Sequence, residues 1–336
     1  MNARRTYRPS AQAALTVAAF ALGCSETRNV GTSVPRGLLP VDERNPILLA
    51  NDGASDNWQG EYAVLLANGG GPELAGIIVS TSPPWPDLDT NMAGWRGLVT
   101  AARASGLRNI PDPIASTGPP LTRPTSGAIK DTTPNRSEGA HLILDASAAL
   151  SLPYRPLVVV TGGRLTDVAD AYLMDPTVAE RVVVVSSLGS TTDTGGAMGA
   201  PNGEMDPWAD SIVTAGFRFV QVSAFYDQTT DVPPARLPEL PANPLGDWIA
   251  AKAKQPTIFN LAQAADQVAV VAVGIPSFVT GVENVSPAAL VGAGASAGPD
   301  LVADPAGPLL LVTQNASADA TNRFWELLLD PNTYGP

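Results

Sequence analysis

The chain has 336 residues, of which 44% are hydrophobic and 15% charged, and its formal net charge is −12. This length can form one large α/β domain or two small ones. The acidic balance argues against a nucleic-acid partner, because no basic patch is present to neutralise phosphates. The single cysteine excludes an intramolecular disulfide.

The first residues predict export. Arg4 and Arg5 precede an apolar, Ala-rich stretch that is too short to cross a bilayer. The stretch ends in Ala21-Leu22-Gly23-Cys24, which resembles the lipobox of bacterial lipoproteins. We therefore expect residues 1–24 to be a lipoprotein signal peptide with Cys24 as the lipidated residue. The protein would then be exported and lipid-anchored at the cell envelope, in the outer membrane or on the periplasmic face. A signal sequence without lipidation is the alternative.

Residues 25–43 predict a flexible tether, since they contain Gly, Pro, Ser and Thr without apolar periodicity. Strand-length apolar runs then alternate with helical patterns, and no linker interrupts them, so residues 44–332 predict a single domain. The expected strands are 47–50, 75–80, 157–161, 182–186, 217–223 and 309–313. The expected helices are 61–68, 93–104, 137–150, 166–172, 207–215, 261–273 and 319–329. This alternation predicts a three-layer αβα fold with a doubly wound, mostly parallel sheet.

The turn after the first expected strand carries the clearest functional pattern. Asp52, Asp56 and Asn57 follow the buried run 47–50, and parallel sheets bind ligands outside the carboxyl ends of their strands. Oxygen ligands alone indicate Ca²⁺ or Mg²⁺ rather than zinc. Asp and Asn are also ordinary turn and cap residues, which is the structural alternative.

The segment 46–66, PILLANDGASDNWQGEYAVLL, resembles the opening of the inosine/uridine-preferring nucleoside hydrolases, whose first strand ends in Asp-x-Asp-Pro-Gly-x-Asp-Asp. The longest similar stretch is 138–188, which includes VVVTGGRLTDVADAYLMDPTVAERVVVVSSLG. Shorter similar segments at 202–222, 264–269 and 323–329 follow in the family's order. The chain thus resembles a divergent member of this family that is a bacterial lipoprotein. The resemblance implies a nucleoside hydrolase-like, Rossmann-like core.

The resemblance implies a calcium site and a catalytic residue. Asp52 matches the family's Asp that binds Ca²⁺ and activates the attacking water. Asn57 stands where a calcium-binding Asp is usual, so the cation site is expected to be weakened by the loss of a charge. A backbone carbonyl at Thr161 and the carboxylate of Asp266 match the remaining metal ligands.

The resemblance also implies a riboside site. Asp56 matches the residue that holds the ribose 2′-hydroxyl, and Asn202 matches a ribose-binding Asn. Trp58, directly after the turn, is the aromatic residue best placed to stack on a base, although such residues are more often core. Trp85, Trp95 and Trp208 are weaker candidates for the same role.

Several family residues are missing. Ala50 replaces the first Asp of the turn, Ala200 a ribose-binding Glu, and Ala265 the His proposed to protonate the leaving base. Asn91 could substitute for an Asn lost after the second strand. The only histidine, His141, is expected to be a packed or surface residue of a helix.

These residues predict an N-ribosyl hydrolase that cleaves the N-glycosidic bond of a purine or pyrimidine nucleoside, or of a related riboside, with Ca²⁺-activated water. The alternative is a catalytically impaired homologue that binds ribosides and a cation, or a protein partner, at the envelope. The expected partners are a small riboside and, through the N-terminal lipid only, the membrane. A homo-oligomer is compatible with the sequence.

Overall fold

The computed structural model describes residues 38–53, 58–187, 202–222, 232–254, 266–288 and 301–335. Cys24, Asp56 and Asn57 lie outside these residues, as do Ala200 and Ala265. The described residues all belong to one compact unit. Val41, inside the expected tether, is already buried in its hydrophobic core.

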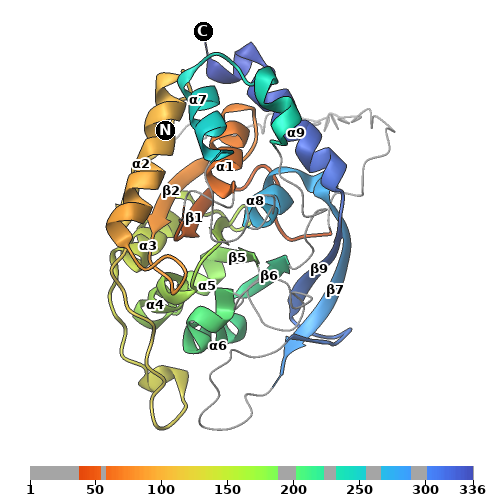
Figure 1. Cartoon of the computed structure of the whole chain (residues 1–336). Helices are drawn as coiled ribbons and strands as arrows, with labels where there is room; N and C mark the ends of the chain where they lie inside the picture. Colours follow the sequence, from red (N-terminus) through yellow and green to blue (C-terminus); the bar gives the residue numbers. More distant parts are fainter. Residues whose placement is uncertain are drawn as a thin grey trace, which may run out of the picture. The chain divides into compact units, whose positions relative to one another are not determined.

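The described residues form a nine-stranded sheet in the order β3-β2-β1-β4-β5-β6-β9-β7-β8 (Figure 1). The first seven strands in this order are parallel to their neighbours, whereas β7 pairs antiparallel with β9 and with β8. This confirms the doubly wound, mostly parallel sheet. The strands are β1 Ile47–Asn51, β2 Leu74–Val79, β3 Pro113–Ala115, β4 Leu157–Thr161, β5 Val182–Ser187, β6 Arg218–Val222, β7 Val279–Pro287, β8 Leu301–Ala303 and β9 Leu309–Asn315.

Helices cover both faces of this sheet, so the fold has three layers. The period of two along β1 explains this: Ile47 and Leu49 face one core cluster, and Leu48 and Ala50 face the other. Helices α1, α2, α8 and α9 pack in the first cluster, and α3, α4 and α6 in the second. The helices are α1 Gln59–Asn68, α2 Leu88–Ala104, α3 Glu138–Leu150, α4 Thr166–Met174, α5 Val178–Arg181, α6 Pro207–Gly216, α7 Pro244–Lys252, α8 Gln267–Gly274 and α9 Ser317–Leu329.

Two helix starts follow directly from local sequence. The Ser137 side chain accepts a hydrogen bond from the backbone N–H of Ala140, as expected of an N-cap before α3. Asp206 caps α6 in the same way, with Pro207 in the first turn. By contrast, α7 is not among the expected helices, although Asn243 caps it and Pro244 stands in its first turn.

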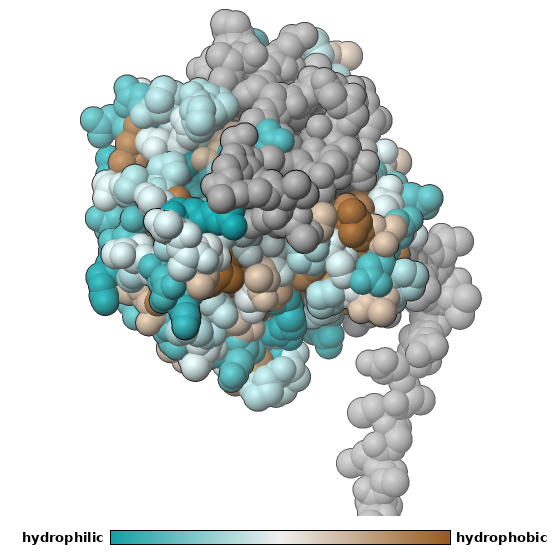
Figure 2. Space-filling model, turned by 90° about the horizontal axis from the view of Figure 1, so that it is seen from below, coloured by the Kyte–Doolittle hydropathy of each residue, from teal (hydrophilic) through white to brown (hydrophobic). Residues whose placement is uncertain are grey.

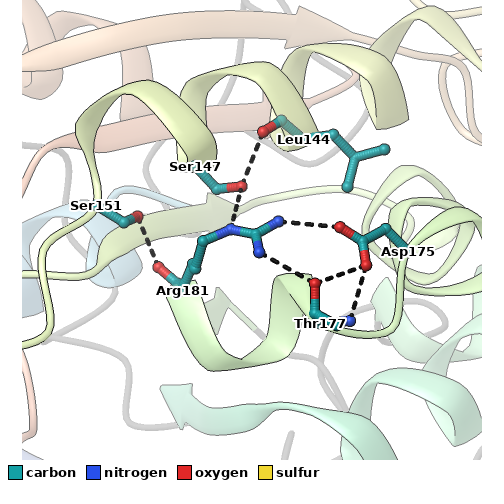
Figure 3. Close-up of polar contacts among 6 residues, drawn as sticks. All are labelled: Leu144, Ser147, Ser151, Asp175, Thr177 and Arg181. Carbon is teal, nitrogen blue, oxygen red and sulfur yellow. Dashed lines mark hydrogen bonds and ion pairs between the residues drawn. The ribbon is translucent and has the colours of Figure 1, made fainter.

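A polar cluster fastens the connection between α4 and β5 to α3 (Figure 3). The Arg181 guanidinium donates to Asp175 and Thr177, each at 3.1 Å, and more distantly to Ser147 on α3. The Ser151 hydroxyl donates to the carbonyl oxygen of Arg181 at 2.8 Å. This cluster holds the start of β5, whose other end reaches the candidate site.

The surface shown in Figure 2 is mainly hydrophilic where it is coloured, with hydrophobic residues scattered over it. Large exposed hydrophobic side chains in the described part of the chain are Leu152, Tyr154, Val302 and Leu329. Among the described helices, none combines the length and the apolar content that crossing a bilayer requires.

Candidate functional site

The candidate site lies where the strand order of the sheet reverses, between β1 and β4. Asn51 ends β1, Asp52 follows it, and Gly162 directly follows β4. In open α/β sheets this switch point, outside the carboxyl ends of the strands, is where ligands bind. The turn that suggested a site in the sequence is therefore at the expected place.

The backbone at Gly162 fits closely between the polar residues of the site. A Cβ atom at this position would lie 2.4 Å from Asn51 Nδ2 and 2.7 Å from Asp266 Cβ and Cγ. Only glycine allows this approach, since real Cβ contacts are not that short. The Gly-Gly pair after β4 marks a turn in the sequence, but nothing in it indicates this packing.

Asp266 joins the site from the start of α8, where it is almost fully buried. Asn51 Nδ2 lies 3.4 Å from one of its carboxylate oxygens, and Asn202 Nδ2 lies 3.5 Å from the other. Gln59 Nε2 donates to the Asp266 backbone carbonyl at 3.3 Å, and Gln59 Oε1 accepts from Asn51 at 2.8 Å. The structure thus brings the predicted residues Asp266 and Asn202 together, and it adds around Asp266 two amides, Asn51 and Gln59, that the sequence analysis did not select.

Asp52 is 3% exposed and accepts a hydrogen bond from the Gly53 backbone at 2.7 Å. Burial raises the pKa of its carboxyl above the ordinary value. A hydrogen bond from Ser82 and the charge of Arg164 act in the opposite direction. Trp95 Nε1 donates to the Asp52 carbonyl at 3.2 Å, which anchors the turn to α2. A buried carboxylate with a raised pKa is typical of a general base.

Arg164 is a functional candidate that the sequence analysis missed. It is buried in the loop after β4, and Nη2 donates to Thr81 Oγ1 and to the carbonyl of Gly118, both at 3.3 Å. Its charge acts on Asp52 and on Asp206. A single Arg in a loop is usually a surface residue. The signal that could have drawn attention to Arg164 is its position between the pair Gly162-Gly163 and the apolar segment that begins at Leu165.

Comparison with solved structures identifies the architecture. An inosine-uridine preferring nucleoside hydrolase from Bacillus anthracis matches with a TM-score of 0.59 and 13% identity, over 86% of this chain and 99% of that one. An inosine-guanosine nucleoside hydrolase matches with a TM-score of 0.59 and 15% identity, over 84% and 98%. The chain has the nucleoside hydrolase fold. No family model matches the sequence, and no curated protein matches it.

A third solved structure with this fold is the type III effector protein XopQ complexed with adenosine diphosphate ribose. It matches with a TM-score of 0.51 and 14% identity, over 89% of this chain and 95% of that one. At these identities the comparisons establish the fold. The residues of the site must be assessed from their own geometry.

Within the nucleoside hydrolase fold, Thr161 ends β4 and is fully buried. Its hydroxyl has no hydrogen-bond partner among the described residues. The residue whose backbone packs against Asp266 is the next one, Gly162. The backbone directly after the expected carbonyl ligand at Thr161 therefore packs against Asp266, another expected ligand.

The four candidate tryptophans differ in burial, and the one expected to be best placed is fully buried. Trp58 has no exposed surface, and the Lys252 ammonium lies 4.4 Å from the centre of its ring, so a base could stack there only if Lys252 moved. Trp95 is also fully buried. Trp208 belongs to the other core cluster, and its Nε1 donates a hydrogen bond to Thr132 Oγ1. Trp85 is half-buried, and its ring lies against Gly53, where a Cβ atom would approach it to 2.6 Å. Of these four tryptophans, Trp85 is the one that is both partly exposed and beside the turn.

Two other predicted residues have clear positions. Asn91 is buried, and its Nδ2 donates to the carbonyls of Ser80 and Trp85, each at 3.0 Å, so it holds the loop after β2. His141 is exposed on α3, in agreement with its interpretation as a helix surface residue.

The donor atoms around the switch point suit a hard cation in type. They are oxygen atoms, with buried carboxylates at Asp52 and Asp266. In number they fall short within the described residues, where no three His, Cys, Asp or Glu side chains gather as a metal site. The other predicted side-chain ligand, Asn57, lies outside those residues.

Proposed function

We propose that this chain is an N-ribosyl hydrolase that cleaves the N-glycosidic bond of a nucleoside or a related riboside. One observation carries this proposal. Asp52, Asn202 and Asp266 come from distant parts of the sequence, and all are buried at the switch point of a nucleoside hydrolase fold. Solved structures with this fold include two nucleoside hydrolases and one adenosine diphosphate ribose complex.

The proposed chemistry assigns each residue a separate task. Asp52 accepts the proton of the attacking water, for which its raised pKa is suited. Positive charge develops on the ribose in an oxocarbenium-like transition state, and the carboxylates of Asp52 and Asp266 stabilise it. Asn202 and Asp56 hold ribose hydroxyls, and Trp85 covers the base.

Bound Ca²⁺ would increase the acidity of the attacking water, and Asp52, Asn57, Asp266 and the Thr161 carbonyl would hold it. Activation of the leaving base has no residue among those described. Its candidates, Tyr226 and the loop 228–231, lie outside the described part of the chain. Export and lipid anchoring at Cys24 remain part of the proposal.

The test is release of free ribose. Purified full-length chain is incubated with inosine, uridine or nitrophenyl riboside in excess Ca²⁺. We expect ribose release that falls on the order of 10²–10⁴-fold in Asp52→Ala, because the general base is lost. Ribose release no higher than that of the Asp52→Ala control would refute the hydrolase.

A second candidate function is a riboside- and cation-binding homologue without catalysis. The replacement of the family's His by Ala265, and the cation Arg164 beside Asp52, favour it. It predicts no ribose release, yet a rise in melting temperature with Ca²⁺ alone that Asp266→Ala abolishes. If the chain released no ribose and its melting temperature did not rise with Ca²⁺, this function would be excluded too.

A further inference from the structure

A pocket lies beside the amino ends of β1 and β4. It has a volume of about 520 Å³ and is lined by the chain that precedes β1 and by residues next to β4 and β7. Helix α8 separates it from the candidate site, since Asp266 precedes the helix and Ala272, near its other end, lines the pocket. This volume is within the range of small-molecule pockets.

One wall of this pocket is apolar. Leu39, Val41, Ala272 and Val279 line it, and Val41, Ala272 and Val279 belong to the main hydrophobic core. The wall is therefore rigidly supported by the packing behind it. An apolar ligand body could be buried against it without rearrangement of the fold.

The other wall is charged, and its charges are not balanced. Arg44 donates to both carboxylate oxygens of Asp42, so these two residues neutralise each other. Arg155 also lines the pocket, but it takes part in none of the ion pairs of the described residues. Its Nε is buried and has no hydrogen-bond partner in that part of the chain. An anion in the pocket would give this buried N–H group a charge-assisted hydrogen-bond partner.

The rim carries an aromatic residue. Tyr154 is 84% exposed, the highest value among the large exposed hydrophobic side chains of the described residues, and it precedes Arg155. A flat ring beside a cation can cover the apolar part of a bound molecule while the cation holds its charged end.

We propose that this pocket binds a small amphipathic anion. The carboxylate or phosphate of the ligand pairs with Arg155, and its apolar body lies against Leu39, Val41 and Val279 under the ring of Tyr154. The site does not depend on the proposed hydrolase activity, because no residue of the switch point lines it.

The test is calorimetric titration of the full-length chain with phenylbutyrate and with phenyl phosphate, which distinguish a carboxylate from a phosphate ligand. We expect saturable binding of at least one of them and at least tenfold weaker binding of the uncharged analogue phenylbutanol. Arg155→Gln removes the charge and leaves a shorter polar side chain, and it should weaken anion binding about tenfold or more.

Two variants make the result specific. Arg96→Gln removes an exposed cation of α2 away from the pocket and should leave binding unchanged. Asp52→Ala should also bind normally, so that failure of the hydrolase proposal does not affect this one. Absence of saturable anion binding, equal binding by Arg155→Gln, or loss of binding in Asp52→Ala would each overturn the proposal.

Discussion

Gly162 shows how one missing side chain permits the candidate site to form. Asn51 and Asp266 approach its backbone from two sides, at distances that a methyl group could not tolerate. Gly163 beside it is less constrained, since its Cβ would lie 3.3 Å from the Asp52 backbone nitrogen. The two adjacent glycines therefore form a matched pair for experiment.

Gly162→Ala should lower the free energy of unfolding by about 1–3 kcal/mol, because the added methyl group overpacks a buried site. Gly163→Ala should cost clearly less. Urea denaturation of both variants and of the unchanged chain measures this difference. Equal effects of the two substitutions would contradict the close packing at Gly162.

At the scale of elements, a buried ion pair joins α7 to α1 directly after the turn. Lys252 Nζ lies 2.8 Å from Glu61 Oε1, and the two side chains are 2% and 1% exposed. Trp248 Nε1 also donates to Glu61 Oε1, at 3.1 Å. The Lys252 ammonium covers the ring of Trp58, the residue that leads into α1. The pair thus supports the helix that begins at the candidate site.

Lys252→Met should destabilise the protein by about 3–5 kcal/mol, because it leaves the Glu61 carboxylate buried without its counter-charge. In the double variant with Glu61→Gln, much of this loss should be recovered. Chemical denaturation of the two single variants and the double variant measures the coupling. If the double variant were as unstable as the sum of the single variants, the pair would not act as a unit.

At the scale of the whole molecule, an acidic chain has buried several of its carboxyl groups. Asp52, Asp167, Asp206 and Asp210 all have raised pKa values with burial as the main cause. The pKa of Asp210 is raised well above its ordinary value, mainly by burial, and the charge of Asp206 adds to the shift. Neither of its carboxylate oxygens has a hydrogen-bond partner among the described residues.

The sign of the pH dependence follows from this shift. Between the unfolded pKa of 3.8 and the raised folded pKa, the folded chain keeps a proton at Asp210 that the unfolded chain has lost. Stability therefore falls as pH rises through this range, by up to about 1.4 kcal/mol per pH unit.

Asp210→Asn should remove this component and flatten the decline of stability above pH 4. Asp145→Asn, at an exposed position on α3, should not. Thermal or urea denaturation over this pH range compares the two variants. Parallel curves for Asp210→Asn and the unchanged chain would contradict the role of Asp210.

The fold was largely predictable because the central strands are continuous apolar runs. The expected strand 157–161 coincides with β4, and the other expected strands lie within a few residues of β1, β2, β5, β6 and β9. The strands β3, β7 and β8 were not among the expected strands. Strand β7 carries Gly, Glu and Asn and is largely solvent-accessible, although it lies between β9 and the edge strand β8. Helix α7 was not expected, because the segment before it is rich in proline.

The candidate site was predictable only in part. Asp52, Asn202 and Asp266 could be selected from the sequence, because each matches a family pattern. Arg164 and Gln59 could not be selected, and Trp85 was only a weaker candidate than Trp58, since their importance depends on which chain segments lie beside them.

The sequence by itself determined the alternation of strands and helices, and hence a parallel sheet with polar residues after β1. Local patterns suffice for this, because burial on two faces requires apolar runs and some helix starts carry their own cap, as α3 and α6 do. Only the tertiary structure decided that Asn51 contacts Asp266, a residue 215 positions away, and that Trp85 rather than Trp58 lies open beside the turn. Such contacts arise from packing across the sheet, which no local pattern encodes.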